Sequence, residues 1–269
     1  MHPMLNIAVR AARTAGNLIA RNLGRQDQFT VEEKHVDDLV TTIDKECEQT
    51  ITSILLKSYR DHAILGEENG LIGNPDAEYC WVIDPIDGTT NFVLGVPHCA
   101  VSIGLRYRGR PEVAVVFDPM LNEMFTAARG EGASLNGRRI RVSKRPTLAG
   151  AVIHTAPPAR YREKMDAFMP VMRRLIDHTA DIRRTGCASL DMAYVACGRC
   201  DGYLELGLKP WDYAAGELLV REAGGLVTDF AGDIDKFHKT GNILCGAPSI
   251  VKGLLTEVTK PADLPAILK

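Results

Sequence analysis

The chain has 269 residues, with 32 Lys and Arg against 34 Asp and Glu, and 45% of its residues are hydrophobic. A chain of this length can bury a large core, either as one large domain or as two smaller ones fused without a linker. The formal net charge of −2 excludes the simplest electrostatic case for a nucleic-acid binder, which would show a pronounced basic excess, so any such partner would need a local basic patch.

The seven cysteines form an odd set, mostly among apolar or small residues, which favours a reduced cytosolic protein over a disulfide scaffold. No stretch approaches the roughly 20 apolar residues that cross a bilayer. The N-terminus also lacks an apolar run followed by a small-residue cleavage site. We therefore expect a cytoplasmic protein without membrane contact. Four arginines in the first 26 residues would also suit an organelle transit peptide, but the helical spacing of the apolar residues there favours a packed first helix.

Hydrophobic periodicity and turn residues define the elements of the first half. In chain order they are a helix over about 5–23, an extended piece at 29–33, an amphipathic helix from Val40 to near Arg60, strands at 63–65, 79–83, 99–107, 112–117 and 123–128, a turn at 108–111 and an Asn136-Gly137 hairpin turn. These elements predict an antiparallel meander beside two helices.

From about residue 150 strands and helices alternate. The predicted elements are strands near 151–155, 181–184, 202–206 and 226–229, and helices near 161–178, 189–197 and 213–222, the last closed by Gly224 and Gly225. The chain contains no linker-like or low-complexity segment. We therefore expect one continuous unit over 1–269 with a soft internal boundary near 146–150.

The stretch WVIDPIDGTTNF, residues 81–92, concentrates the chemistry of the chain. A buried strand ends in Asp84, Pro85 interrupts its pairing, and Asp87 follows before Gly88 opens a helix or turn. Backbone N–H groups at a helix start favour an anion. Two acids beside an anion site repel each other unless cations lie between them, and hard oxygen ligands of this kind suit Mg²⁺.

Other acids occupy comparable positions at the ends of predicted elements. Glu67 and Glu68 follow the 63–65 strand, and Asp212 stands at the head of the helix over 213–222. Taken singly, Asp212 is explained by helix N-capping and the glutamates by a solvated loop. The Asp84 and Asp87 turn has no such simple explanation.

The motifs GEENG (66–70), DPIDGTTNF (84–92) and WDYAAGELLVREAGG (211–225) resemble those of the inositol monophosphatase family of magnesium-dependent, lithium-sensitive phosphatases. The resemblance extends to KHVDDLVTTID (34–44) and DGYLELG (201–207), and is greatest to the bacterial SuhB-like branch. It implies an α+β layered (αβαβα) sandwich, usually a homodimer.

The resemblance also implies roles for particular residues. Glu67, Asp84, the Ile86 carbonyl and Thr89 would surround a first Mg²⁺. Asp84, Asp87 and Asp212 would bind a second Mg²⁺, and a third, weaker ion would share Glu67. Asp44 would accept a hydrogen bond from the Thr89 hydroxyl.

The remaining implied roles concern the substrate. Gly88, Thr89 and Thr90 match the phosphate cradle, Glu205 matches the carboxylate that binds a ring hydroxyl, and Gly186, Cys187 and Ala188 would line the same pocket. Lys34 matches a basic residue near the phosphate.

These roles predict direct hydrolysis of myo-inositol 1-phosphate and related polyol or sugar monophosphates by a metal-activated water, positioned by Glu67 and by Thr89 backed by Asp44. Fructose bisphosphatase and nucleotide 3′-phosphatase relatives share the metal motifs, and Glu205 argues for the inositol type. The expected enzyme is a phosphoric monoester hydrolase.

A competing hypothesis starts from the basic run at 138–145, which contains Arg138, Arg139, Arg141, Lys144 and Arg145 and no acid. Charge runs usually lie on solvated faces. The SuhB-like branch also includes members that act in ribosomal RNA transcription antitermination, independently of catalysis, through the transcription machinery. A transcription elongation factor, RNA polymerase or RNA is therefore the alternative partner.

Two smaller signals carry less weight. Arg183 and Arg184 would serve in a dimer contact or in the pocket wall. Cys197 and Cys200 form a CxxC without a second ligand pair at zinc-site spacing, so we interpret them as a coincidental pair of thiols.

Overall fold

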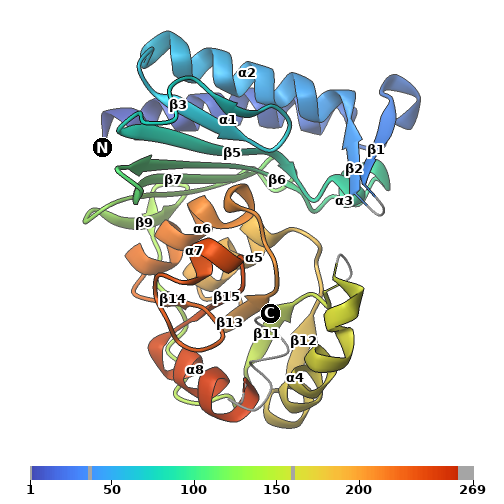
Figure 1. Cartoon of the computed structure of the whole chain (residues 1–269), viewed down its shortest axis with the longest axis vertical. Coiled ribbons are helices and arrows are strands. Elements are labelled where there is room, and N and C mark those ends of the chain that lie inside the picture. Colours follow the sequence, from blue (N-terminus) through green and yellow to red (C-terminus); the bar gives the residue numbers. More distant parts are fainter. Residues whose placement is uncertain (1, 36–37, 159–160, 260–269) are drawn as a thin grey trace.

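The structure, a computed structural model, describes residues 2–35, 38–158 and 161–259, and its helices and sheets alternate in five layers (Figure 1). The layers are a helix pair α1 and α2, an eight-stranded sheet, a second helix pair α5 and α6, a five-stranded sheet, and the helices α4 and α8 on the far side. The expected α+β sandwich of alternating layers is confirmed.

The eight-stranded sheet is antiparallel except between β3 and β5, which run parallel. In pairing order its strands are β10 (Arg138–Arg139), β9 (Gly132–Leu135), β8 (Glu123–Ala128), β7 (Arg110–Asp118), β6 (Ala100–Tyr107), β5 (Tyr79–Asp87), β3 (Ala63–Gly66) and β4 (Gly70–Ile72). The predicted meander is confirmed. Its first turn is tighter than expected, because Arg108 and Gly109 alone connect β6 to β7, both with positive φ.

Helices α1 (Pro3–Asn22) and α2 (Thr42–Ser58) cover the outer face of this sheet. The Thr41 hydroxyl caps α2 by accepting hydrogen bonds from the N–H groups of Ile43 at 3.2 Å and Asp44 at 3.3 Å. The predicted start of this helix at Val40 is therefore wrong. Val40 belongs to strand β2 (Asp38–Thr41), which pairs with β1 (Val31–His35) in a separate hairpin.

The middle layer consists of α5 (Ala188–Ala196) and α6 (Pro210–Glu222), which are covered by a sheet on each side. Small residues let α6 approach the first sheet closely. A Cβ on Gly104 of β6 would lie 3.0 Å from the Ala214 Cβ, tighter than ordinary packing. The predicted C-cap is confirmed, because Gly224 has φ +90° just after α6.

The second sheet has the order β12 (Asp181–Arg183), β11 (Val152–Thr155), β13 (Gly202–Glu205), β15 (Ile243–Gly246) and β14 (Leu226–Thr228). Strand β11 runs parallel to both of its neighbours, whereas β15 is antiparallel to β13 and β14. The division into halves near 146–150 stays a prediction.

The remaining described elements are short except for one long helix. They are η1 (Gln26–Gln28), α3 (Thr89–Val93), η2 (Arg162–Lys164), α4 (Met165–His178), α7 (Phe237–Thr240), α8 (Pro248–Gly253) and η3 (Leu254–Val258). Helix α4 starts later than the predicted residue 161, because a separate 3₁₀ turn precedes it. Sequence patterns predict none of the elements after residue 229.

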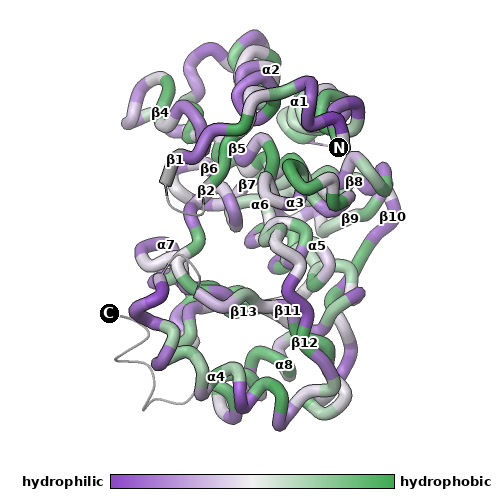
Figure 2. The backbone as a smooth tube through the Cα atoms, turned by 90° about the vertical axis from the view of Figure 1, so that its right-hand side faces the viewer, coloured by the Kyte–Doolittle hydropathy of each residue, from purple (hydrophilic) through white to green (hydrophobic). Residues whose placement is uncertain are grey.

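The hydropathy of the chain follows these layers (Figure 2). Hydrophobic residues dominate along β5 and β6, while hydrophobic and hydrophilic residues alternate along the outer helix α2. Within the described ranges, no helix has both the length and the apolar character needed to cross a membrane.

Candidate active site

A cavity of about 680 Å³ lies where the end of β5 meets the starts of α3, α5 and α6. Nearly all of the predicted site residues line it: Glu67, Asp84, Ile86, Asp87, Gly88, Thr89, Thr90, Gly186, Cys187, Ala188, Glu205 and Asp212. Asp44 lies behind Thr89, and the side chain of Lys34 falls outside what the structure describes. The fold thus gathers residues from distant segments, while their individual roles stay predictions.

A bulge at the end of β5 places the two acids of the DPIDG motif. Asp84 pairs with Ser102 of β6 and Asp87 with Ala100, so two residues of β5 face one of β6 between them. Pro85 has no N–H to donate and fits such an interruption. The carboxylates are nearly enclosed, with 2% of Asp84 and 9% of Asp87 exposed. This confirms that Pro85 interrupts the pairing, although the strand assignment itself continues to Asp87 rather than ending at Ile83.

The turn into α3 requires glycine at position 88. Gly88 has φ +90°, and a Cβ there would lie 3.1 Å from the His98 carbonyl oxygen and 3.3 Å from that of Gly186. The Asn91 side chain closes the same turn, because Nδ2 donates to the carbonyls of His98 at 2.8 Å and Thr185 at 2.9 Å. Asn91 had no predicted role, and it joins the turn at Gly88 to the loop before α5.

The Thr89 hydroxyl lies between two acceptors. Its Oγ1 is 3.1 Å from Asp44 Oδ1 and 3.0 Å from the Ile86 carbonyl oxygen. A hydroxyl donates one hydrogen bond, and the lone pairs of its oxygen can still accept a hydrogen bond from water. Asp44 is itself fixed by the Thr41 N–H at 2.8 Å from Oδ2. Burial raises the Asp44 pKa to about 6.

Asp87 is connected to the start of α5. Its Oδ2 accepts hydrogen bonds from the Ser189 N–H at 2.6 Å and from the Cys187 thiol at 3.2 Å. A carboxylate at a helix N-terminus is favoured by the unpaired N–H groups there. Cys187 therefore touches a predicted metal ligand as well as the cavity.

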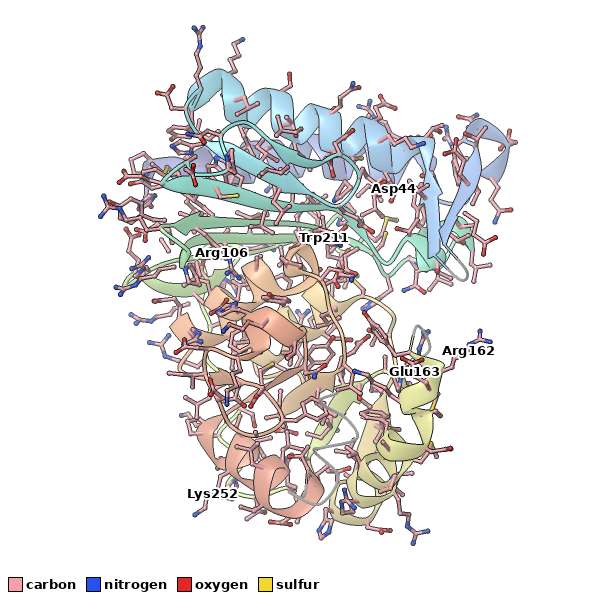
Figure 3. The ribbon with its side chains drawn as sticks, in the orientation of Figure 1. Asp44, Arg106, Arg162, Glu163, Trp211 and Lys252 are labelled. Atoms are coloured by element: carbon pink, nitrogen blue, oxygen red, sulfur yellow. The ribbon has the colours of Figure 1, made fainter. Side chains whose placement is uncertain are left out.

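Asp212 and Glu205 come from the second half of the chain. Helix α6 begins at Pro210, so Asp212 belongs to its first turn rather than preceding the helix, and its Oδ2 accepts the Lys209 N–H at 2.7 Å. Trp211 lies between the two sheets in Figure 3, and its carbonyl accepts the Ser102 hydroxyl at 3.2 Å. Glu205, at the end of β13, accepts the Tyr203 hydroxyl at 2.8 Å.

The buried carboxylates of the cavity have raised pKa values. Burial raises the pKa of Asp84 well above its ordinary value, and the nearby charges of Glu67, Asp87 and Asp212 add to that shift. Burial likewise raises the pKa values of Asp87 and Asp212, and brings that of Glu205 to about 7. Each shift means that the protein by itself disfavours the ionised form, whereas a cation held by these oxygens would favour it.

The donor set suits Mg²⁺ in chemistry, because it combines carboxylates with a backbone carbonyl and a hydroxyl. Among the described residues, no three His, Cys, Asp or Glu side chains already form a compact ligand group. Asp84 and Glu67 nevertheless lie within hydrogen-bonding reach of each other, which adds to the raised pKa of Asp84.

Glu48 is a second residue that the sequence analysis missed. Its buried carboxylate on α2 accepts hydrogen bonds from the loop that carries Glu67. The signal was available in the helical pattern, because Glu48 interrupts the apolar face that includes Ile51 and Leu55. A charged residue on a buried helix face needs a partner.

The remaining sequence signals separate clearly. Arg184 lines the cavity, whereas Arg183 is exposed and pairs with Asp181. Cys197 and Cys200 are free thiols, and burial raises the pKa of each. Among the ion pairs of the described residues, one involves the basic run: Arg145 Nε lies 3.2 Å from a carboxylate oxygen of Asp201.

Comparison with known proteins gives matches along nearly the whole chain. The sequence profile of the inositol monophosphatase family matches residues 1–262. Nus factor SuhB of Vibrio cholerae serotype O1 is 52% identical over 269 residues, all of both chains. Nus factor SuhB of Escherichia coli K12 is 52% identical over 258 residues, 96% of each chain.

Solved structures give the same picture. The extragenic suppressor protein suhB from Bartonella henselae superposes with a TM-score of 0.93 at 39% identity, over 97% of this chain and all of that one. Inositol monophosphatase from Anabaena superposes with a TM-score of 0.83 at 37% identity, over 98% of this chain and 95% of that one. The similarity is therefore one of both sequence and fold.

Proposed function

The chain belongs to the inositol monophosphatase family, and from that premise we propose that it is a magnesium-dependent phosphomonoesterase. Its substrates would be myo-inositol 1-phosphate and related polyol or sugar monophosphates. Proteins of this family are generally Mg²⁺-dependent, and family and fold together support phosphatase activity. The SuhB-like branch is the part of the family to which the chain is most similar among the relatives described above.

One observation carries the proposal. Glu67, Asp84, Asp87 and Asp212 line the same cavity as the start of α3 and Glu205. Carboxylates gathered in one cavity need cations to neutralise them, and the start of a helix favours an anion such as phosphate. Together the two features make a site for cations and a phosphate. The raised pKa of Asp84 supports this assignment, because a bound cation would favour the ionised carboxylate that burial and the neighbouring acids disfavour.

The residues of the chain divide the work of hydrolysis. Glu67 and Thr89 would orient the attacking water. Asp44 would accept the hydrogen bond that the Thr89 hydroxyl donates, so that the hydroxyl oxygen can accept a hydrogen bond from that water. The backbone at Gly88, Thr89 and Thr90 would hold the phosphate in line with the attack. No covalent enzyme intermediate is required.

Two Mg²⁺ ions are proposed per subunit, with a third, weaker one. Glu67, Asp84, the Ile86 carbonyl and Thr89 would hold the first, and Asp84, Asp87 and Asp212 the second, while the third would share Glu67. When bound, these ions would lower the pKa of water and stabilise the leaving oxygen.

The second half of the chain would select the substrate. Glu205 would accept a hydrogen bond from a ring hydroxyl, and Gly186, Cys187 and Ala188 would form the surrounding wall. Lys34 is proposed to approach the phosphate. A site built to bind hydroxyl groups discriminates strongly against substrates that lack them, because its buried polar groups are then unpaired.

The test is phosphate release by the purified protein with Mg²⁺. Inositol 1-phosphate, other polyol and sugar monophosphates, fructose 1,6-bisphosphate and a nucleoside 3′-phosphate would be compared under equal conditions. We expect the highest kcat/KM for a cyclic polyol phosphate and loss of release when EDTA removes the ion. The proposal is wrong if inositol 1-phosphate gives no phosphate and Asp84→Asn behaves like the wild type.

A second function is favoured by the names of two close relatives, both called Nus factor SuhB. We propose that this chain also acts in ribosomal RNA transcription antitermination by contacting an elongation factor, RNA polymerase or RNA, independently of hydrolysis. Arg138, Arg139, Arg141 and Lys144 are exposed on and after the edge strand β10, which suits such a contact.

Complementation of a deletion strain separates the two functions. An Asp87→Asn variant should rescue growth if the cellular role needs no catalysis, and a variant with Arg138, Arg139 and Arg141 changed to Ser should then fail. The opposite pattern would assign the cellular role to hydrolysis. We further propose that the protein is a homodimer in the cytoplasm, in accord with its free thiols.

A further inference from the structure

Glu48 lies one helical turn after Asp44 in α2, and its side chain is fully buried. Its carboxylate accepts three hydrogen bonds from the loop after β3. Oε2 accepts from the Glu68 N–H at 2.8 Å, and Oε1 accepts from the Asn69 N–H at 2.9 Å and from Asn69 Nδ2 at 2.7 Å. A buried carboxylate is tolerated only with such partners, and these bonds are of the strong, charge-assisted kind.

The contact between α2 and this loop is also close sterically. A Cβ on Gly66 would lie 2.5 Å from the Glu48 Cδ and from both carboxylate oxygens. The carboxylate therefore rests directly against the backbone at the end of β3. Any larger side chain at position 66 would displace either the loop or the carboxylate.

Helix α2 thereby contacts two separate parts of the cavity wall. Residues four apart lie on one face of a helix, so Asp44 and Glu48 point to the same side. Asp44 accepts the Thr89 hydroxyl, and Glu48 binds the loop that carries Glu67. One helix thus contacts both the Thr89 hydroxyl and the loop that carries Glu67. Glu48 is not among the described residues that line the cavity, so it acts on Glu67 through the loop.

We propose that Glu48 is a positioning residue, which fixes the loop 67–69 so that Glu67 is presented to the cavity and thereby sets the affinity of the site for a divalent cation. This inference deepens the proposed phosphatase function and rests on Glu67 being a ligand. It predicts that weakening the Glu48 contacts loosens the loop before any metal or substrate is added.

The main test compares Glu48→Gln with Glu46→Gln, an exposed glutamate on the same helix. Glutamine keeps the size of the side chain but replaces one acceptor oxygen by an amide that cannot accept a hydrogen bond. In the metal-free protein we expect faster amide hydrogen exchange at Glu68 or Asn69 in Glu48→Gln alone. Calorimetric titration with Mg²⁺ should then show about tenfold weaker binding, which is the smallest loss of affinity typical when a residue that supports a metal ligand is changed.

A second variant approaches the same contact from the loop. Gly66→Ala leaves Glu48 intact but places a methyl group against its carboxylate, so it should show the same faster exchange and weaker Mg²⁺ binding. It also keeps the test decisive if Glu48→Gln fails to fold, which circular dichroism would show. Unchanged exchange at Glu68 and Asn69 in the folded variants, or unchanged Mg²⁺ affinity, would overturn the proposal.

Neither measurement depends on hydrolysis. If the wild-type protein binds Mg²⁺ but releases no phosphate, the proposed phosphatase function fails while the role of Glu48 is still tested. If the wild type hydrolyses substrate and Glu48→Gln matches it in exchange and in Mg²⁺ affinity, only the role of Glu48 fails. With active protein, we expect the Mg²⁺ concentration for half-maximal rate to rise about tenfold while KM for substrate stays within about twofold.

Discussion

The two walls of the cavity are held in different ways. The first-sheet wall, defined by Glu67, Asp84 and Thr89, is fixed from behind by buried carboxylates of α2. The second-sheet wall, defined by Gly186, Cys187 and Glu205, is instead joined to the first at its loop before α5, where the Cys187 thiol donates to Asp87 and Asn91 Nδ2 donates to the Thr185 carbonyl.

This difference suggests a division of labour. Support by one helix from behind suits a wall where atoms must meet ions and water in one geometry. A wall that only recognises hydroxyl groups tolerates looser fixation. Substitutions in the first-sheet wall should therefore affect kcat and metal binding, and those in the second-sheet wall should affect KM.

The largest effect is expected for Asp84→Asn. Loss of a ligand common to both proposed ions removes several kcal/mol of charge stabilisation, and each 1.4 kcal/mol is a factor of ten, so kcat should fall about 10³-fold. Phosphate release at saturating substrate measures this. Asp76→Asn, an exposed acid in the turn before β5, is the matched control. Retention of more than a tenth of the wild-type kcat would contradict the division between the walls.

The next effect concerns the hydroxyl between Asp44 and the Ile86 carbonyl. Thr89→Val keeps the shape of the side chain and removes the hydroxyl, so kcat should fall about 10²-fold, the lower range for a positioned proton-transfer group. Thr89→Ser retains the hydroxyl and should keep most of the rate. Equal activity of the Val and Ser variants would show that this hydroxyl has no part in the reaction.

A smaller effect is expected in the second-sheet wall. Glu205→Gln should raise KM about tenfold, the value of one hydrogen bond to a charged group, with kcat changed less. Because the pKa of Glu205 is about 7, its carboxylate loses its charge as the pH falls below that value. The wild-type KM should therefore rise from pH 8 to pH 6, and that of Glu205→Gln should stay flat. Glu163→Gln, an exposed glutamate in η2 (Figure 3), should show the wild-type dependence.

The smallest effect concerns stability without metal. The folded state raises the pKa of Asp84 above its ordinary 3.8, so it binds the proton more tightly than the unfolded chain. The free energy of unfolding therefore falls as the pH rises above that ordinary value. At pH 8 the metal-free Asp84→Asn protein should unfold at a higher temperature than the wild type, by about 3 °C for each 1 kcal/mol gained.

Thermal unfolding followed by circular dichroism measures this difference. Adding Mg²⁺ should stabilise the wild type and reverse the order, because only the wild type retains the full set of ligands. A metal-free variant that unfolds at a lower temperature than the wild type would mean that Asp84 stabilises the fold directly.

Several parts of the fold could be predicted because their signals are local. The Asn136-Gly137 turn, the Gly224 helix end and the apolar run of β5 each depend on neighbouring residues. The start of α2 could not, since Val40 suits the apolar face of either a helix or a strand. Only the capping bonds of Thr41 and the pairing of β2 with β1 decide between them.

The candidate site divides along the same line. Local sequence determined which residues carry charge and where Pro85 and Gly88 turn the chain, because those effects reach over only a few residues. Tertiary structure alone decided that Asp212 and Glu205 face Asp84 across one cavity, and that Glu48 supports Glu67. Contacts between segments far apart depend on how the layers pack, and hydrophobic patterning fixes which face is buried but not which neighbour it meets.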